Sequence, residues 1–337
     1  LLSVALPKYL EPVKIKEKVK VYSRQDCKYC HGVKNMLQRL KINYEEIELD
    51  DKEKRREVIE TLNKDIESEE DKIKTLPQLF IGDKRIGGYK EFVYYMRPTF
   101  NFEKLREITK LCVRNLNKLI DYNYYPVPET ETSNRRHRPI GIGVQGLADV
   151  FAQMRIPFDS EEAIELSRKI AEHMYFAALT SSMEIARKRK KHVQDYRRYL
   201  KKNKEDLSEE EIKHMDELRE KYFIYKDEIE KLPMGLAGAY SSFVGSPASH
   251  GELQFDLWNV EPSEEMMEEW NQLKEDIKKH GLRNSLLMAM MPTASTSQIL
   301  GNNECIEPFN SNYFTRKTLA GEFNVINKYL IQDCLDL

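Results

Sequence analysis

The motif Cys27-Lys28-Tyr29-Cys30 constrains this chain more than any other stretch. The apolar alternation of Val19–Tyr22 predicts a strand before it, and Tyr29–Leu40 has the period of an amphipathic helix. Cys27 would then lie at a helix N-terminus, where unpaired N–H groups and the helix dipole stabilise a thiolate. Cys30, one turn further along, is placed to attack a mixed disulfide formed at Cys27. The spacing therefore predicts a redox-active dithiol.

Two other chemistries use a cysteine pair at this spacing. The same pattern forms half of a zinc site, but Cys112, Cys305 and Cys334 are scattered and form no second pair. With His31 the motif also matches the attachment pattern of c-type haem, which belongs to exported proteins. Five cysteines, an odd and sparse set, fit a reducing cytosol better. We therefore favour a cytoplasmic redox dithiol and predict no metal site.

Composition limits the partners that this chain is expected to have. A length of 337 residues predicts two or three domains. Charged residues make up 33% of the chain and the formal net charge is -2, which gives no reason to expect nucleic acid or a membrane as a partner. The longest apolar run, Leu286–Met291, is too short to span a bilayer and is interpreted as a buried strand. Since the chain starts at Leu1 and ends within an expected helix, we expect both ends to be cuts through something larger.

The elements around the dithiol are predicted to follow the order βαβαββα. After the first strand and helix come a strand, a helix, a hairpin turning at Gly82-Asp83 and a last helix, at Tyr44–Leu49, Asp51–Asn63, Leu79–Ile86 and Glu91–Met96. Two further marks follow the dithiol in order, Thr75-Leu76-Pro77 and Gly87-Gly88. From about Lys16 to Met96 the chain resembles glutaredoxins, which have a thioredoxin-like fold.

The glutaredoxin resemblance implies a role for each residue that matches the family's pattern. Cys27 would be the nucleophile and Cys30 the resolving cysteine, with glutathione as the reductant. In that family the proline is cis and faces the dithiol, and the glycine pair lets the glutathione backbone come close. The residues implied to line the glutathione groove are Arg24, Tyr29, Leu76, Pro77, Gly88 and Tyr89. Lys28 departs from the family, where a proline is common, and this bears on the redox potential.

Beyond Pro98 the chain changes to longer helices. Phe102–Tyr122 and Ser160–Arg187 both have a helical period. Lys188–Lys231 is densely charged and predicts an exposed helical hairpin with Ser208 as an N-cap. We interpret this hairpin as a solvated decoration, with an interaction arm as the alternative.

A glycine-rich stretch, Gly141-Ile142-Gly143-Val144-Gln145-Gly146, spells the dinucleotide-binding fingerprint. No apolar strand precedes it, because the basic cluster Asn134–Arg138, interpreted as a solvated loop, stands there. The acidic residue expected to bind the ribose would also fall within the next helix. We therefore expect these glycines to allow close packing at a strand-to-helix corner.

The stretch Pro292-Thr293-Ala294-Ser295-Thr296-Ser297 follows the apolar run Leu286–Met291. Small hydroxyl residues at a helix start, directly after a buried strand, can cradle a phosphate with backbone N–H groups and side-chain hydroxyls. The alternative is an ordinary run of N-cap residues.

Outside the glutaredoxin-like part, the chain resembles the large, catalytic subunit of class I ribonucleotide reductase. The matching runs are Leu2–Leu10, Val113–Asn117, Arg138–Asp149, Gly245–Ser249, Leu257–Val260 and Gly281–Phe309. The resemblance implies an α/β fold in which a glutaredoxin is inserted into part of a ten-stranded α/β barrel. It divides the chain into a barrel strand, the glutaredoxin domain, a barrel segment, a charged helical insertion and a final barrel segment, at 1–15, 16–98, 99–187, 188–238 and 239–337.

The reductase resemblance also implies a substrate and partners. Ribonucleoside diphosphates would be reduced to deoxyribonucleotides for DNA replication, with the diphosphate held by Pro292, Thr293, Ala294, Ser295 and Thr296. The partners would be the remaining segments of the large subunit and the radical-generating small subunit. The family's radical-forming cysteine and the substrate-reducing cysteine pair lie in sequence absent here. Cys112, Cys305 and Cys334 match neither role and are interpreted as structural.

Three functional hypotheses follow. The favoured one is a reductase segment whose built-in dithiol re-reduces the barrel after each turnover, at high effective concentration. The second is a stand-alone glutathione-dependent disulfide oxidoreductase with a non-catalytic barrel appendage. The third is an assembly subunit that completes another chain's barrel while its glutaredoxin is idle.

Overall fold

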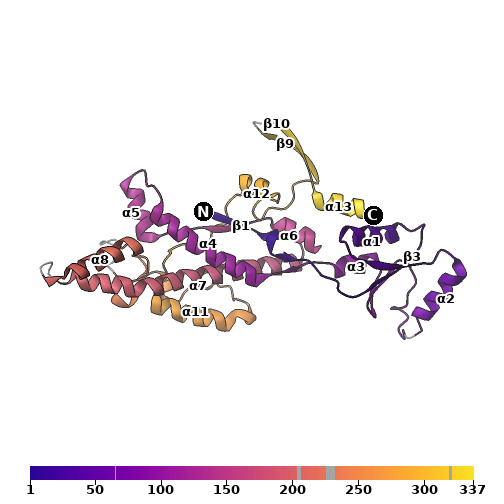
Figure 1. Ribbon diagram of the computed structural model, residues 1–337, viewed down its shortest axis with the longest axis horizontal. Coiled ribbons are helices and arrows are strands. Elements are labelled where there is room, and N and C mark those ends of the chain that lie inside the picture. Colours follow the sequence, from indigo (N-terminus) through magenta and orange to yellow (C-terminus); the bar gives the residue numbers. More distant parts are fainter. Residues whose placement is uncertain (65, 203–205, 225–231, 319–320) are drawn as a thin grey trace. The chain divides into compact units, whose positions relative to one another are not determined.

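The computed structural model describes residues 1–64, 66–202, 206–224, 232–318 and 321–337, and they form two compact units. Unit 1 comprises Leu1–Tyr9, Asn101–Leu147 and Asp159–Ile306. Unit 2 comprises Leu10–Phe100, Ala148–Phe158 and Glu307–Leu337. Each unit is therefore assembled from segments that are distant in the sequence, as the sequence colours of Figure 1 show.

The centre of unit 2 is a four-stranded mixed sheet. Strand β3 (Val19–Ser23) pairs in parallel with β4 (Tyr44–Glu48) and antiparallel with β5 (Gln78–Ile81), which pairs with β6 (Lys84–Gly87). Alternate residues of β3 are buried, as expected for a strand whose two faces differ. Side chains from this sheet, from α1 (Lys28–Arg39) and from α3 (Tyr89–Tyr95) form the core: Val19, Val21, Val33, Met36, Leu37, Leu79, Ile81 and Phe92.

The predicted order βαβαββα is confirmed, with α2 (Lys52–Leu62) as the second helix. The predicted hairpin turns at Gly82, which has the positive φ that glycine tolerates. Unit 2 also contains the strand pair β2 (Leu10–Glu11) and β7 (Thr99–Phe100), most of α6 (Leu147–Met154), the hairpin of β9 (Tyr313–Thr318) and β10 (Gly321–Ile326), and α13 (Lys328–Asp336).

Unit 1 is largely helical. Helix α4 (Phe102–Tyr122) has the predicted bounds and packs along α7 (Glu161–Leu200), which also contacts α11 (Met267–His280) (Figure 1). Shorter helices are α5 (Pro128–His137), α10 (Gln254–Leu257) and α12 (Ala294–Leu300), and single 3-10 turns lie at Leu6–Tyr9, Met234–Leu236, Pro247–His250 and Glu264–Met266.

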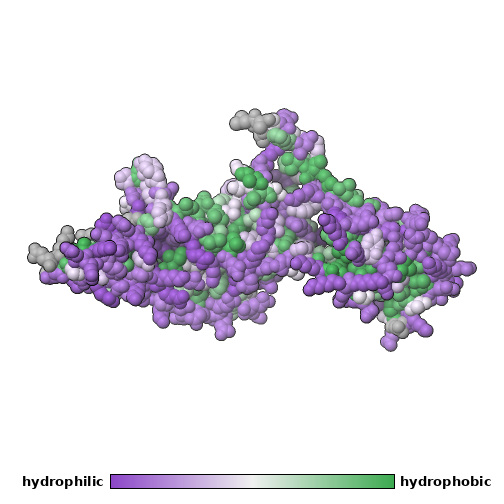
Figure 2. Space-filling model, viewed as in Figure 1, coloured by the Kyte–Doolittle hydropathy of each residue, from purple (hydrophilic) through white to green (hydrophobic). Residues whose placement is uncertain are grey.

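The charged hairpin is confirmed in its described part, but it has a core of its own. Helix α7 runs on to Leu200, and α8 (Glu209–Tyr222) starts with the predicted cap at Ser208, completed by Glu211 as a capping box. Hydrophilic side chains cover the visible face of both helices in Figure 2. Beneath them lies a small apolar cluster formed by Val193, Tyr196, Leu218, Ile224 and Ala237. Residues 203–205 and 225–231 of this prediction lie outside the described residues.

Strand β1 (Leu2–Ala5) lies within the predicted barrel strand 1–15, whereas the prediction for Leu286–Met291 needs correction. Strand β1 pairs in parallel with β8 (Ile142–Gln145), and it ends where the turn containing Pro7 begins. The run Leu286–Met291 is not a buried strand, because within the described residues it forms a single bridge, between Met288 and Ile142. The N–H of Met291 donates to the carbonyl of Ala289, and this tight turn leads the chain away from β8. Leu286 and Met290 are exposed as a result.

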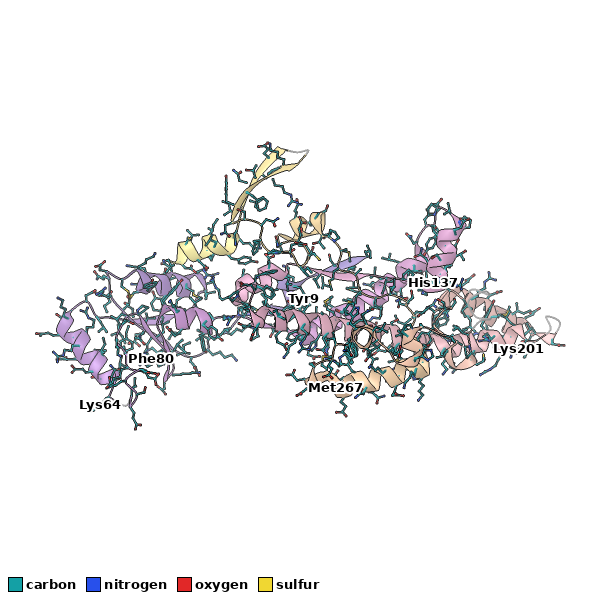
Figure 3. All side chains as sticks on the ribbon, turned by 180° about the vertical axis from the view of Figure 1, so that it is seen from behind. Tyr9, Lys64, Phe80, His137, Lys201 and Met267 are labelled. Atoms are coloured by element: carbon teal, nitrogen blue, oxygen red, sulfur yellow. A yellow bond between two sulfur atoms is a disulfide. The ribbon has the colours of Figure 1, made fainter. Side chains whose placement is uncertain are left out.

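The basic cluster Asn134–Arg138 is also not the predicted solvated loop. Its first four residues form the end of α5, whose last residue His137 is labelled in Figure 3. Arg138 caps this helix in the left-handed conformation, and its side chain is only 1% exposed. Its guanidinium binds both carboxylate oxygens of Asp121 on α4, at 2.7 and 2.8 Å. A buried charge requires such a partner, which a local sequence pattern does not reveal.

Among the described residues, no helix has the length and apolar character needed to cross a membrane.

Candidate functional site

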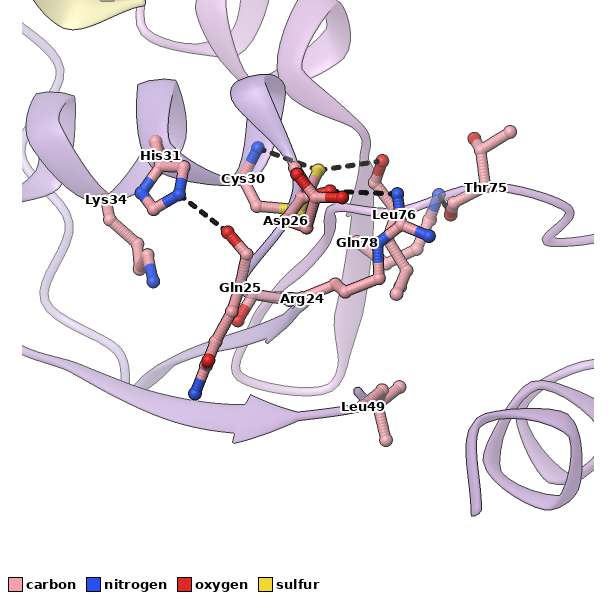
Figure 4. The surroundings of a disulfide bond; sticks show 12 residues. Arg24, Gln25, Asp26, Cys30, His31, Lys34, Leu49, Thr75, Leu76 and Gln78 are labelled. Atoms are coloured by element: carbon pink, nitrogen blue, oxygen red, sulfur yellow. Dashed lines mark hydrogen bonds between the residues drawn. A yellow bond between two sulfur atoms is a disulfide. The ribbon is translucent and has the colours of Figure 1, made fainter. Parts of the chain in front are cut away.

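The dithiol lies where the first strand of unit 2 leads into its first helix. Cys27 is the N-cap of α1, in an extended conformation, and the backbone N–H of Cys30 donates to its sulfur at 3.2 Å (Figure 4). The two sulfur atoms are joined in a disulfide, with the Cα atoms 5.2 Å apart. An N–H aimed at this sulfur, at the positive end of the helix dipole, stabilises the thiolate that reduction would produce.

The two sulfurs differ in exposure, and this separates their chemical roles. Cys27 is partly exposed, whereas Cys30 is fully buried beneath α1. Only Cys27 can therefore meet a sulfur from another molecule or segment. Cys30 can react with a sulfur bound to Cys27, which is the task of a resolving cysteine.

The segment containing Pro77 packs beside the dithiol. The peptide bond between Leu76 and Pro77 is cis, as the glutaredoxin resemblance predicts. The carbonyl oxygen of Leu76 lies 3.8 Å from the sulfur of Cys27. Gln78, which is buried, donates to the carbonyl of Thr75 at 3.0 Å and accepts from Arg85 at the same distance. These bonds order the turn that faces the dithiol.

The loop before the dithiol is held by a residue that the sequence reasoning did not select. His31 was considered only as part of a haem pattern, but its Nε2 lies 2.7 Å from the carbonyl oxygen of Gln25. The N–H of Gln25 donates to Asp50 at 2.8 Å. Arg24 donates to the carbonyl of Asp26 at 3.0 Å (Figure 4). A histidine one residue after Cys-x-x-Cys lies on the same helix turn, which is the signal that could have identified it.

The remaining residues of the expected glutathione groove fall into two neighbouring pairs. The rings of Tyr29 and Tyr89 are 5.7 Å apart, and Tyr29 is 53% exposed. A Cβ at Gly88 would lie 3.5 Å from the carbonyl oxygen of Pro77, so the glycine approaches that segment closely. The N–H of Gly88 is bound by Glu91 at 2.9 Å. The structure thus brings the expected residues around Cys27, and their binding roles stay predictions.

A polar group lies between β3, β4 and α1. Glu46 accepts hydrogen bonds from Ser23 and from Lys34, the latter at 2.8 Å. Burial acts to raise the pKa of Glu46, but the hydrogen bonds from Lys34 and Ser23 outweigh it and hold the pKa below its ordinary value. Glu46 is therefore ionised at neutral pH and links the strand that leads to the dithiol with its helix.

The second candidate site is the start of α12 in unit 1. Thr293, the N-cap, is buried, and its hydroxyl accepts a hydrogen bond from the N–H of Cys305 at 2.8 Å. The other predicted residues are exposed, namely Pro292, Ala294, Ser295 and Thr296. Because the first N–H groups of a helix have no partner within it, they can bind an anion here. The hydroxyl of Thr293 itself is committed to the protein.

Gln145, which the sequence reasoning missed, lies beside this helix start. Its Oε1 accepts from the hydroxyl of Thr296 at 3.0 Å. Its Nε2 is buried and, within the described part of the chain, has no hydrogen-bond partner. A polar residue at the carboxyl end of a parallel strand is the signal that could have identified it, because ligands of open α/β sheets bind at that edge.

The glycines near Gln145 serve close packing, as predicted. A Cβ at Gly143 would lie 2.3 Å from the carbonyl oxygen of Ala289, and a Cβ at Gly141 would lie 2.8 Å from the side chain of Ala289. Gly146 has a φ of 81° at the corner between β8 and α6. The strand-to-helix corner therefore brings the segment that leads to Pro292 against β8.

Comparison with known proteins identifies both parts of the chain. Residues 89–337 match the family model described as the ribonucleotide reductase barrel domain. The chain belongs to this ribonucleotide reductase family. Residues 19–86 of the same chain match the glutaredoxin family model. Both resemblances noted in the sequence are confirmed, and the α/β class holds for both parts.

Relatives of the reductase part are large subunits of one enzyme. The large subunit of ribonucleoside-diphosphate reductase from Dictyostelium discoideum is 50% identical over 239 residues, which cover 71% of this chain and 22% of that protein. The one from Plasmodium falciparum is 46% identical over 246 residues, covering 73% and 24%. The large chain from Neurospora crassa is 44% identical over 246 residues, covering 73% and 21%. The chain thus spans about a fifth to a quarter of the length of these reductase subunits.

A solved structure also matches this reductase-family chain. It is the crystal structure of glutaredoxin 1 from Francisella tularensis complexed with cacodylate, 35% identical over 22% of this chain and 86% of that one, with a TM-score of 0.21. The glutaredoxin assignment of residues 19–86 rests on the family model.

Proposed function

We propose that this chain forms part of a ribonucleoside-diphosphate reductase large subunit and carries its own dithiol reductant. The observation that carries the proposal is the disulfide of Cys27 and Cys30 at the N-terminus of α1, within a chain whose residues 89–337 belong to the reductase family. Strand β1, which precedes the glutaredoxin match, pairs with β8, which follows it. This pairing supports a glutaredoxin inserted into a continuous reductase fold.

The proposed chemistry is thiol–disulfide exchange in two steps. The Cys27 thiolate attacks a disulfide formed in the barrel during turnover, makes a mixed disulfide with one barrel sulfur and releases the other as a thiolate. The Cys30 thiolate then attacks the Cys27 sulfur, so that the second barrel thiol is released and the Cys27–Cys30 disulfide closes. The exposed Cys27 and the buried Cys30 suit these roles.

Glutathione would restore the dithiol. One glutathione thiolate attacks Cys27, which frees Cys30 as a thiol, and a second attacks the bound glutathione sulfur and leaves as glutathione disulfide. Two glutathiones thus supply the two electrons of each cycle. The groove for the glutathione backbone would be lined by Arg24, Tyr29, Leu76, Pro77, Gly88 and Tyr89, with no cofactor held tightly in this chain.

The substrate class follows from the start of α12. We infer that Pro292, Thr293, Ala294, Ser295 and Thr296 hold the diphosphate of a ribonucleoside diphosphate. The exposed helix start supports this, as does the unpartnered amide of Gln145 beside Thr296. Since the Thr293 side chain is buried, this residue would contribute its backbone.

The proposed architecture is a ten-stranded α/β barrel completed by the remaining segments of the large subunit. In it, residues 1–15, 99–187 and 239–337 belong to the barrel, 16–98 to the glutaredoxin domain and 188–238 to a helical insertion. The radical-generating small subunit would be the partner that starts catalysis, in the cytoplasm.

Replacing Cys27 by serine in the assembled reductase tests this function. We expect glutathione-driven ribonucleotide reduction to be lost, while reduction driven by a small dithiol that reaches the barrel directly is retained. Cys334→Ser is the matched control, because Cys334 is an exposed cysteine outside the dithiol and both activities should survive.

The alternative functions predict different results. Unchanged glutathione-driven turnover in Cys27→Ser would contradict a built-in reductant and favour an assembly role. Disulfide exchange at Cys27 with no ribonucleotide reduction in any assembly would favour a stand-alone oxidoreductase.

A further inference from the structure

Helix α13 connects two parts of unit 2 that belong to different families. At its start, the hydroxyl of Tyr329 donates to Asp149 at 2.8 Å, a residue within the reductase match. At its end, Asp336 accepts two hydrogen bonds from the Arg39 guanidinium of α1, at 3.0 and 2.7 Å, within the glutaredoxin match. One short helix therefore contacts both the reductase segment and the glutaredoxin helix α1.

These contacts lie on one face of α13. Tyr329, Asp333 and Asp336 are spaced four and three residues apart, which places them on one side of a helix. Asp333 forms an ion pair with Arg155, six residues after Asp149. The face therefore engages the reductase segment over its first two turns and the glutaredoxin helix at its last turn.

Within α13, Asp336 accepts one neutral hydrogen bond, from the amide of Gln332 at 3.0 Å. The described turn of α13 around Asp336 contains no basic side chain. Its side chain is only 7% exposed, so the carboxylate needs a charged partner, and the fork of Arg39 matches its two oxygens. Asp336 thus finds its charged partner on α1 and not on its own helix.

The facing side of α1 is shaped for this contact. Asn35, one turn before Arg39, donates to the backbone carbonyl of Asp336 at 3.0 Å. One turn earlier again, a Cβ at Gly32 would lie 3.3 Å from the same carbonyl and 3.2 Å from the side chain of Leu337. Glycine is disfavoured inside a helix, so its presence here is accounted for by the close approach of the neighbouring groups, Tyr89 included.

We propose that Gly32, Asn35 and Arg39 form a docking face through which the reductase segment holds its own glutaredoxin domain. The partner is the turn of α13 around Asp336, which presents its carboxylate to Arg39 and its backbone carbonyl to Asn35. The dithiol is then carried by a docked domain and not by a free tether. This goes beyond the proposed function, because docking does not depend on the reaction at Cys27.

Charge reversal in the full chain tests the docking face. We expect Asp336→Arg, or Arg39→Asp, to make the backbone amides of α13 exchange hydrogen about tenfold faster, and the double exchange of charges to restore protection. The control is Arg56→Asp, which removes the exposed ion pair with Glu60 on α2 and should leave α13 unchanged. Asp336→Asn adds a milder variant that keeps the shape of the side chain.

The results decide between docking and mere proximity. Exchange of α13 within twofold of the wild type in the single variants, or a double variant no better protected than the singles, would overturn the proposal. Disulfide exchange with a small glutathione mixed disulfide serves as a separate readout of Cys27 chemistry. If this exchange is absent from the wild-type chain, the proposed function fails while hydrogen exchange still decides the docking.

Discussion

Replacing Asp121 by alanine is expected to destabilise unit 1 by about 3 kcal/mol, because it leaves a buried guanidinium without its counter-ion. The side chain of Arg138 is 1% exposed and that of Asp121 is 12% exposed. Both oxygens of the carboxylate are bonded by the two terminal nitrogens of the guanidinium. Breaking a buried pair by removing one partner costs about 3 to 5 kcal/mol.

The lower end of this range applies because the polar contacts between Arg138 and Asn117 survive. Arg138 also donates to the backbone carbonyl of Asn117 at 3.0 Å, and this bond remains in the variant. Replacing both members, as in Asp121→Leu with Arg138→Met, removes the charge that would otherwise be buried alone. We therefore expect the double variant to be more stable than Asp121→Ala.

This ion pair matters for the site because it belongs to a buried network. Asn284 donates to the carbonyl of Arg138 at 2.9 Å and to Asn117 at 3.1 Å, and its oxygen accepts from Ser182 at 2.9 Å. The chain continues from Asn284 towards Pro292. Loosening the network is therefore expected to weaken the nucleotide binding proposed for the start of α12, as well as stability.

Tryptophan fluorescence during urea unfolding measures the effect. Both tryptophans of the chain, Trp258 and Trp270, lie in unit 1, and Trp270 is 1% exposed, so its emission reports the unfolding of that unit. Glu165→Gln is the control, since Glu165 pairs with Arg168 on the surface of α7 and such pairs contribute up to about 1 kcal/mol. A loss in Asp121→Ala no larger than in this control would refute the reasoning.

Three further predictions concern the dithiol, the packing at β8 and the partly exposed carboxylate of Glu46. Cys30→Ser should trap a mixed disulfide between Cys27 and glutathione, which mass spectrometry detects, because the resolving sulfur is absent. Gly143→Ala should cost about 1 to 3 kcal/mol in urea unfolding, since its Cβ would meet a backbone carbonyl at 2.3 Å, whereas a Cβ at Gly235 meets nothing within 4 Å and Gly235→Ala should change little. With the pKa of Glu46 below 4.5 in the folded state, its stabilisation is complete above that pH and is lost as the pH falls through the folded value. Glu46→Gln should therefore flatten the pH dependence of melting by circular dichroism below pH 4.5.

Local patterns in the sequence determined the part of this protein that surrounds the dithiol. The order βαβαββα, the position of Cys27 at a helix start and the bounds of α4 all follow from hydrophobic period, turn residues and motif spacing. Each of these features depends on a pattern of neighbouring residues in the sequence. The same is true of the two family resemblances, which the family models confirm.

Only the tertiary structure decided which residues, distant in the sequence, pair with one another and become buried. The sequence predicts that the basic cluster Asn134–Arg138 is solvated. In the structure, Asp121 of α4 binds the buried guanidinium of Arg138. The apolar run Leu286–Met291 has the composition of a buried strand, but a turn at its end limits it to a single bridge. Asp336 and Arg39 are 297 residues apart. The local sequence around each of them indicates an ordinary charged residue on the surface. Whether a side chain is buried and paired depends on which other segment packs against it. The hydrophobic period of the local sequence does not contain this information.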